Sequence, residues 1–207
     1  MEPPRRPSLP LPDAPPLAVP PAFARLIAMN EQMNLTSVTE PSAAWERHAL
    51  DALSLVPCLA DLGAGERVLD VGSGGGVPGI PIAIARRDLA IVLLDATVKK
   101  VAFLSEVAQT LGLSNVEAVA GRAEELARGE LRGSFAAVTA RAVAKIDALL
   151  PWTAPFVRPG GRLLFIKGER AGDELAAARS VLAKFRCTVD RVVPTPTGRV
   201  VVIRRAS

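Results

Sequence analysis

The sequence predicts an α/β fold with a mostly parallel sheet of seven strands, a C-terminal β-hairpin and an N-terminal helical cap. Three observations support this prediction. Short apolar runs alternate with segments of helical periodicity, which is typical of strands buried between helices. A glycine-rich segment directly follows the first of these runs. Two further apolar runs at the C-terminus lie a few residues apart, which is the spacing of a hairpin.

The N-terminal part of the chain is predicted to lie outside this sheet. Residues 1–21 hold nine of the 18 prolines, so we predict a disordered or extended tail there. Residues 22–62 are predicted to form the helical cap, with one helix over 23–33 and a second over 42–59. Residues 63–207 then form the α/β domain.

Composition narrows the class of protein. The chain has 207 residues, which suits one domain with a small appendage. No apolar run approaches the ~20 residues that span a bilayer, so we expect no membrane anchor. Cys58 and Cys187 form no CxxC pair, and His48 is the single histidine. These observations argue against a metal site and a disulfide framework and favour a reducing cytoplasm.

Basic residues gather at the C-terminal end. The formal net charge is +4, and the segment from residue 184 onward carries six basic residues against one acid, Asp190. A basic end suits an acidic partner such as nucleic acid. A solvated C-terminal face explains the charge equally well, so charge alone leaves both interpretations open.

The segment from Arg67 to Gly79 organises the rest of the chain. An apolar run with β-branched residues predicts a buried strand, and four glycines follow it between positions 72 and 76. Pro78 stands where a helix can begin. A strand, a glycine turn and a helix hold nucleotides well, because a ligand can lie against the backbone and helix amides point toward it.

Two ligands fit this segment. Gly74, Gly76 and Gly79 satisfy the G-x-G-x-x-G dinucleotide pattern, with Asp95 about 20 residues further on. However, Asp70 precedes the turn, and its carboxylate suits the cationic S-adenosylmethionine better than a pyrophosphate. We therefore favour S-adenosylmethionine over a dinucleotide, and both over a glycine turn without a ligand.

The remaining elements alternate between strand and helix. Gly112 is expected to cap the helix before it. Five β/α units followed by a hairpin match the Rossmann-like sheet of S-adenosylmethionine-dependent methyltransferases. We predict strands over 90–94, 116–119, 135–139, 162–166, 187–193 and 199–203, helices from about 79 and over 99–111, 146–156 and 174–185, and a turn over 159–161.

Several residues at the ends of these strands are candidates for chemistry. Asp95 can accept both hydroxyls of a ribose. Ala123 and Glu124, after the third strand, can line an adenine. Arg141 ends the fourth strand, where amine methyltransferases carry an Asn/Asp-Pro-Pro-aromatic motif, and Lys167 at the next strand end is a candidate phosphate contact.

The sequence resembles the bacterial RsmG family, also called glucose-inhibited division protein B, from about residue 24 to the C-terminus. Members are guanine-N7 methyltransferases of small-subunit ribosomal RNA. The glycine segment alone indicates only a methyltransferase, whereas its Pro-Gly-Ile-Pro extension and the other pieces are specific. The matching pieces are Asn34-Leu35-Thr36, Arg47-His48 with Asp51, Leu69 to Gly74, Pro78 to Pro81, Leu94-Asp95, Lys99-Lys100 with Phe103-Leu104, Arg122 to Glu124, Ala140 to Ala142 and Lys167-Gly168.

The resemblance implies a cofactor site and an RNA side. The residues implied to contact S-adenosylmethionine are Gly72, Val77, Asp95, Ala96, Thr97, Ala123, Glu124 and Arg141, to which the turn itself adds Asp70 and Gly74. On the RNA side we expect Asn34, Arg47, His48, Lys167 and Arg199, although His48 is equally well explained as a packed histidine. Met29 and Met33 stand near the place where the family often has an aromatic residue, and Ala52 replaces a common serine.

The expected reaction is methylation of N7 of one guanine in 16S ribosomal RNA, which by resemblance is the guanine of the 530 loop. Guanine N7 has a lone pair and no proton, so the reaction needs alignment rather than a general base. We expect Arg141 to orient either the cofactor or the guanine, whose O6 is an edge that arginine recognises. Trp45 and Trp152 are candidates for base stacking, but a core position explains each better. The partner would be the small ribosomal subunit or its RNA, and the protein a monomer in the cytoplasm.

Three other functions remain open from the sequence. A small-molecule methyltransferase would act without RNA and without salt dependence. An NAD-type oxidoreductase would bind a dinucleotide in preference to S-adenosylmethionine. A non-catalytic ribosome assembly factor would bind subunits without transferring a methyl group.

Overall fold

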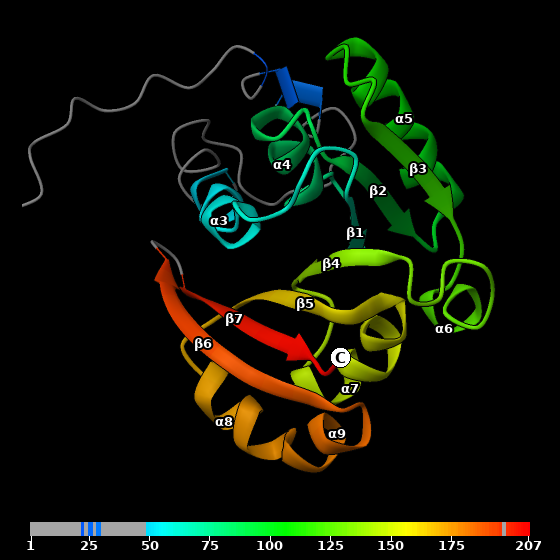
Figure 1. Ribbon diagram of the computed structural model, residues 1–207. Coiled ribbons are helices and arrows are strands. Elements are labelled where there is room, and N and C mark those ends of the chain that lie inside the picture. The colour runs from blue at the N-terminus through cyan, green and yellow to red at the C-terminus, as the bar shows by residue number, and fades with distance from the viewer. Residues whose placement is uncertain (1–21, 23–24, 27, 30–48, 196–197) are drawn as a thin grey trace, which may run out of the picture.

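The architecture is a seven-stranded sheet with helices on both faces, as a computed structural model of the chain shows (Figure 1). The structure describes residues 22, 25–26, 28–29, 49–195 and 198–207. The strand order is β3-β2-β1-β4-β5-β7-β6, in which only β7 pairs antiparallel to its two neighbours. The strands are β1 (Arg67–Val71), β2 (Ala90–Asp95), β3 (Val116–Ala120), β4 (Phe135–Arg141), β5 (Val157–Lys167), β6 (Cys187–Thr195) and β7 (Gly198–Arg205).

This topology confirms the predicted fold class. The first five strands are parallel, and the sequence ends in the predicted hairpin of β6 and β7. The helical elements that the structure describes after residue 50 are α3 (Asp51–Leu53), η2 (Val56–Leu59), α4 (Gly79–Ala85), α5 (Val98–Thr110), α6 (Ala123–Leu126), α7 (Ile146–Thr153), η3 (Ala154–Phe156), α8 (Ala171–Ala177) and α9 (Arg179–Lys184).

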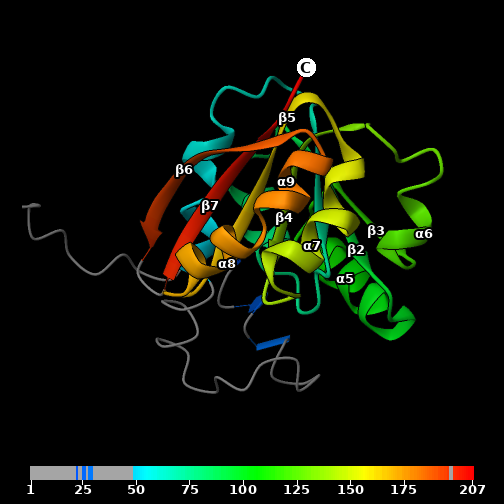
Figure 2. The same ribbon diagram turned by 90° about the horizontal axis from the view of Figure 1, so that it is seen from below.

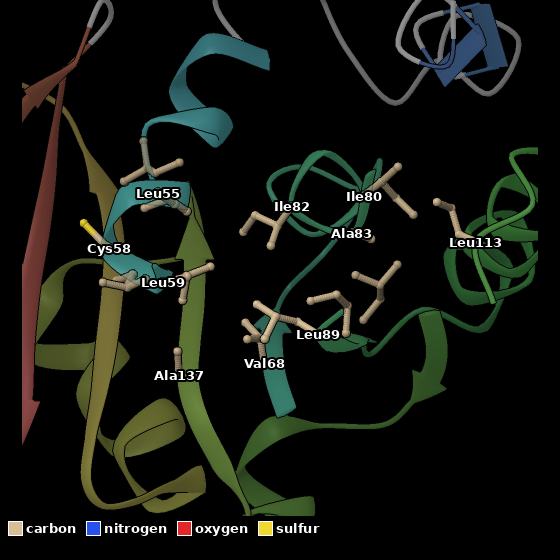
Figure 3. Packing of buried hydrophobic residues seen from close by; sticks show 14 of the residues in the cluster. Leu55, Cys58, Leu59, Val68, Ile80, Ile82, Ala83, Leu89, Leu113 and Ala137 are labelled. Atoms are coloured by element: carbon tan, nitrogen blue, oxygen red, sulfur yellow. The ribbon is translucent and has the colours of Figure 1, made fainter. Parts of the chain in front are cut away.

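Each central strand is buried on both faces, which explains its continuous apolar run. In β1, Val68 belongs to the core on one side of the sheet and Leu69 to the core on the other. Figure 3 shows Leu55, Ile80 and Ile82 packing around Val68 on the first side. The second core lies under α6 to α9, on the opposite side of the sheet (Figure 2).

Three predicted elements differ from the structure. The helix predicted over 42–59 is replaced, in its described part, by α3 and then η2, because Pro57 has no N–H to continue an α-helix. The helix predicted over 174–185 is divided into α8 and α9 at Ala178, whose ψ of −1° leaves the α-helical range. The predicted turn over 159–161 lies inside β5, where Gly160 has a φ of +73° and the pairing with β4 shifts register.

The N-terminal predictions are only partly covered by the structure. Ala22, Arg25, Leu26, Ala28 and Met29 are helical, in agreement with a helix over 23–33 as far as they reach. Residues 1–21 and 30–48 lie outside the described residues, and Asn34, Arg47 and His48 lie with them. Within the described part of the chain, no helix is long and apolar enough to cross a membrane.

Candidate active site

A cavity opens at the carboxyl end of the parallel strands, where β1 and β2 lead into their loops. Its wall combines the ends of β1 and β2, the turn between β3 and α6, the start of α6, the loop between β4 and α7, and one residue of α7. Ligands of open α/β sheets bind at this edge, beside the strand where the order reverses. The lining residues are Val71, Gly72, Leu94, Asp95, Ala96, Gly121, Arg122, Ala123, Glu124, Val143 and Trp152.

The glycine turn after β1 is built as its sequence predicts. The amides of Gly72 and Ser73 both donate to the carbonyl of Leu94, at 2.8 and 3.0 Å, which ties the turn to β2. Gly72 has a φ of +71°, and a Cβ built on it would lie 2.8 Å from Cγ2 of Val143. Glycine is therefore required here both by the backbone and by the close approach of the facing loop.

Asp70, which was predicted to contact the cofactor, does not line this cavity, and its carboxylate is bound within the protein. The side chain is 1% exposed. Its Oδ2 accepts a hydrogen bond from the Gly79 amide (3.1 Å), and its Oδ1 accepts one from the Thr139 hydroxyl (2.8 Å). Asp70 therefore joins β1 to the start of α4 and to β4, because buried carboxylates need protein donors. Burial raises the pKa of Asp70 to about 6.

Asp95 lies in the cavity wall, at the end of β2. Its Oδ2 accepts a hydrogen bond from the Gly74 amide (3.0 Å), and its Oδ1 accepts one from the Thr97 amide (2.9 Å). Lys100 Nζ lies 3.9 Å from Oδ2. Each carboxylate oxygen can accept a further bond, so Asp95 can receive two ligand hydroxyls. Gly74 and Thr97, which were predicted to contact the cofactor, do not line the cavity and instead orient Asp95.

A further part of the cavity wall is formed by the start of α6, the turn before it, and α7. Ala123 and Glu124 line it as predicted, and Arg122 lies 3.8 Å from Glu124 in an ion pair. Trp152 of α7 is partly buried against the second core, in agreement with its predicted core position, and it also lines the cavity, which the sequence did not indicate. Helical spacing in the sequence could have indicated this position. The buried residues of α7 are Ile146, Leu149, Leu150 and Thr153, so Trp152 lies beside the buried face of the helix.

Val77 also departs from its predicted place. It is partly buried against the core beneath α4 and does not line the cavity formed by the described residues. The residue follows the glycine turn directly, so its side chain packs where α4 begins and not where a ligand would lie.

Arg141 is the last residue of β4, one position beyond Ala140, which pairs with Val71. This register places Arg141 beside the start of the glycine turn, although it does not line the cavity that the described residues form. It is half-buried, and its positive charge partly opposes the effect of burial on the pKa of Asp70.

Lys167, which was predicted to contact a phosphate, is engaged within the protein. Its Nζ lies 2.8 Å from Oε2 of Glu174 and donates to the carbonyl of Ala144, and its side chain is 9% exposed. Arg199, opposite Lys167 in the pairing of β5 with β7, is exposed as its prediction requires. Among the described residues, no group of three or more His, Cys, Asp and Glu could hold a metal ion.

The basic C-terminal segment is less open than its composition indicated. Arg191 and Arg204 both lie within 4 Å of Asp190, at 2.8 and 3.7 Å. Arg205 donates to the carbonyls of Ala154 and Val157. Only part of the charge excess is therefore available to a partner.

The chain is similar to ribosomal RNA methyltransferases over most of its length. The family model described as rRNA small subunit methyltransferase G matches residues 22–199. The chain is 54% identical over 184 residues to the ribosomal RNA small subunit methyltransferase G of Sorangium cellulosum, which covers 89% of this chain and 77% of that protein. It is 44% identical over 180 residues to the protein of the same name from Mycobacterium marinum, with 84% and 77% covered.

Solved structures with a similar fold are more distant. A SAM-dependent methyltransferase from Aquifex aeolicus superposes with a TM-score of 0.62 at 18% identity, covering 86% of this chain and 97% of that chain. A methyltransferase from Geobacter sulfurreducens superposes with a TM-score of 0.63 at 17% identity, covering 94% and 92%. These likenesses show the fold.

Proposed function

This chain belongs to the rRNA small subunit methyltransferase G family, and on that premise we propose that it methylates N7 of one guanine, that of the 530 loop, in 16S ribosomal RNA. Family membership makes the protein an S-adenosylmethionine-dependent ribosomal RNA methyltransferase. The observation that carries the proposal is the cavity in which a carboxylate at the end of β2 faces a glycine turn at the end of β1. We further propose that the protein acts in the cytoplasm, on the small ribosomal subunit or its RNA.

The residues of the cavity fit the cofactor. Asp95 has acceptor capacity for the ribose hydroxyls, and Gly72 lets a ligand approach the backbone. Ala123 and Trp152 offer apolar surface to an adenine, and Glu124 can accept from its amino group. S-adenosylmethionine supplies an electrophilic methyl group on a sulfonium. The task of the protein residues is to hold that group, exclude water and present the acceptor in line.

Guanine N7 is an acceptor whose methylation requires no general base from these residues. Its lone pair lies in the plane of the base and carries no proton, so methylation there needs no group to remove one. We propose that Arg141, beside the glycine turn, orients the guanine through O6, because arginine recognises the O6/N7 edge. A base in a folded RNA must leave its stack to reach such a cavity.

The first experiment compares small-subunit RNA from cells with and without this gene by mass spectrometry. The expected result is one 7-methylguanosine that is absent from the deletion strain and is restored by purified protein with S-adenosylmethionine. A missing methyl group on another atom would overturn the N7 assignment. An RNA with all its modifications unchanged would overturn the proposed acceptor altogether.

The same purified components identify the form of the substrate. Protein-free 16S ribosomal RNA and assembled small subunits, both from the deletion strain, are offered in parallel with labelled cofactor. We expect label in RNA from at least one of the two preparations. Label in neither preparation would contradict the proposed partner.

A further inference from the structure

The loop between β4 and α7, residues 142–145, closes one side of the cavity. Val143 lines the cavity while remaining 37% exposed, and its Cγ2 stands 2.8 Å from the place where a Cβ on Gly72 would be. Ala142 has a φ of +54°, which is uncommon for a residue other than glycine. The loop is thus held in an unfavourable conformation that brings Val143 against the glycine turn.

Two charged side chains from other elements hold the backbone of this loop. Lys167, at the end of β5, donates from Nζ to the carbonyl of Ala144. Glu174, in α8, accepts from the amide of Ile146 at Oε2 (3.0 Å). The same Oε2 lies 2.8 Å from Lys167 Nζ, so the two groups also bind each other.

The pair is well sheltered from water. The side chain of Lys167 is 9% exposed and that of Glu174 is 22% exposed. Hydrogen bonds that involve charged partners are about twice as strong as neutral ones, and they gain further where water is excluded. The pair is therefore suited to hold a strained loop, and Lys167 offers little to an external phosphate.

We propose that Lys167 and Glu174 are positioning residues that hold the loop of residues 142–145 so that Val143 completes the cofactor cavity at Gly72. Both contacts lie on the C-terminal side of Val143, since Ala144 follows it directly and Ile146 begins α7. When either charge is removed, the loop loses one backbone partner and the other charge is left unpaired. The cavity wall then moves away from the glycine turn, and cofactor affinity falls.

Three variants and a matched control test this proposal. Glu174→Ala removes the acceptor, Glu174→Gln keeps an acceptor oxygen without the charge, and Lys167→Met removes the ammonium. Asp173→Ala is the control, because Asp173 is an exposed acid next to Glu174 in the first turn of α8. If removal of any acid from the first turn of α8 lowered the affinity for the cofactor, Asp173→Ala would show the same loss as Glu174→Ala.

Two measurements are made on the purified protein without RNA. Calorimetric titration gives the affinity for S-adenosylmethionine, and hydrogen exchange gives the protection of the Ile146 amide. We expect about tenfold weaker binding and faster Ile146 exchange in Glu174→Ala. We expect a smaller loss in Glu174→Gln, weaker binding in Lys167→Met, and wild-type values in Asp173→Ala. A double variant that removes both the Lys167 and the Glu174 charge should lose less affinity than the sum of the losses in its two single variants.

Wild-type affinity and wild-type Ile146 exchange in Glu174→Ala would overturn the proposal, as would equal losses in Glu174→Ala and Asp173→Ala. The inference rests on the cofactor site of the proposed function, but neither measurement involves the RNA. A protein that binds S-adenosylmethionine, shows these losses and leaves the guanine unmethylated would refute the proposed acceptor and leave the positioning role supported.

Discussion

Asp70 shows how a single buried carboxylate can join the elements around a ligand site. Its oxygens accept from Gly79, at the start of α4, and from Thr139, in the neighbouring strand. A Cβ at Gly79 would lie 2.9 Å from Oδ2 of Asp70, so the glycine allows this close contact. The carboxylate therefore positions the helix that follows the glycine turn.

The pKa of Asp70 predicts how stability depends on pH. Burial raises this pKa from 3.8 to about 6, so between these values the folded protein keeps a proton that the unfolded chain releases. The contribution of Asp70 to stability is fully present below pH 3.8 and is lost as pH rises through about 6. We compare wild type with Asp70→Asn by urea unfolding from pH 4 to pH 7. Relative to the variant, wild type should lose up to about 3 kcal/mol over this range. If the free energies of unfolding of wild type and Asp70→Asn changed in parallel with pH, the raised pKa of Asp70 would be contradicted.

Arg141 carries the clearest prediction for activity. Arg141→Ala should lower methyl transfer to the RNA by roughly 10²-fold, because a misplaced acceptor loses its alignment with the methyl group. The measurement is single-turnover transfer at saturating S-adenosylmethionine. Arg132→Ala is the matched control, since Arg132 is exposed and precedes the opposite end of β4. Unchanged transfer in Arg141→Ala would remove Arg141 from the mechanism.

At the scale of elements, α7 combines two roles in one short helix. Ile146, Leu149 and Leu150 bury its inner face against the sheet, whereas Trp152 turns toward the cavity. The loop before α7 carries Val143, so the helix and its loop together supply two apolar walls of the site. A movement of α7 would therefore change the cofactor site directly.

Trp152 should report cofactor binding through its fluorescence. We expect emission to change when S-adenosylmethionine is added to a Trp45→Phe variant, in which Trp152 is the remaining tryptophan. Trp152→Ala should weaken binding by about tenfold or more, since stacking of an aromatic side chain on a base contributes about 1–3 kcal/mol. Trp152→Phe should retain most of the affinity. Emission that does not respond to saturating cofactor would show that Trp152 is remote from the ligand.

At the scale of the whole molecule, the cavity at the sheet edge and the C-terminal hairpin differ in the charge that they present. The cavity wall carries two acidic residues and one basic residue, Asp95, Glu124 and Arg122, of which the last two form an ion pair. In the hairpin, Asp190 engages two of the arginines, while Arg199 remains exposed next to the end of β5. Cofactor binding and RNA binding should therefore respond differently to salt.

Salt should separate the two binding events. The affinity for RNA should fall linearly on a log–log plot, with a slope of roughly −0.7 per phosphate contact in a single strand. The affinity for S-adenosylmethionine should change little over the same range. Filter binding of 16S ribosomal RNA between about 50 and 200 mM salt, with wild type and Arg199→Ala, measures the first effect. The variant should show a shallower slope, and an identical slope would exclude Arg199 from the RNA contact.

Local sequence alone determined the sheet, the glycine turn and the strand-end residues of the cavity. An apolar run followed by glycines specifies a strand and a turn through backbone sterics, which act within a few residues. Gly72, Asp95, Ala123 and Glu124, which were predicted to contact the cofactor, consequently line one cavity.

Tertiary structure decided what the charged side chains bind. Asp70 pairs with Thr139 and Lys167 with Glu174, and no local pattern indicates which donor or acceptor a folded chain will bring to a buried charge. Trp152 reached the cavity for the same reason, because the packing of α7 on the sheet set its direction. A buried charge takes the nearest partner that folding supplies, since leaving it unpaired costs several kcal/mol, and that partner is set by the three-dimensional arrangement of the strands and helices.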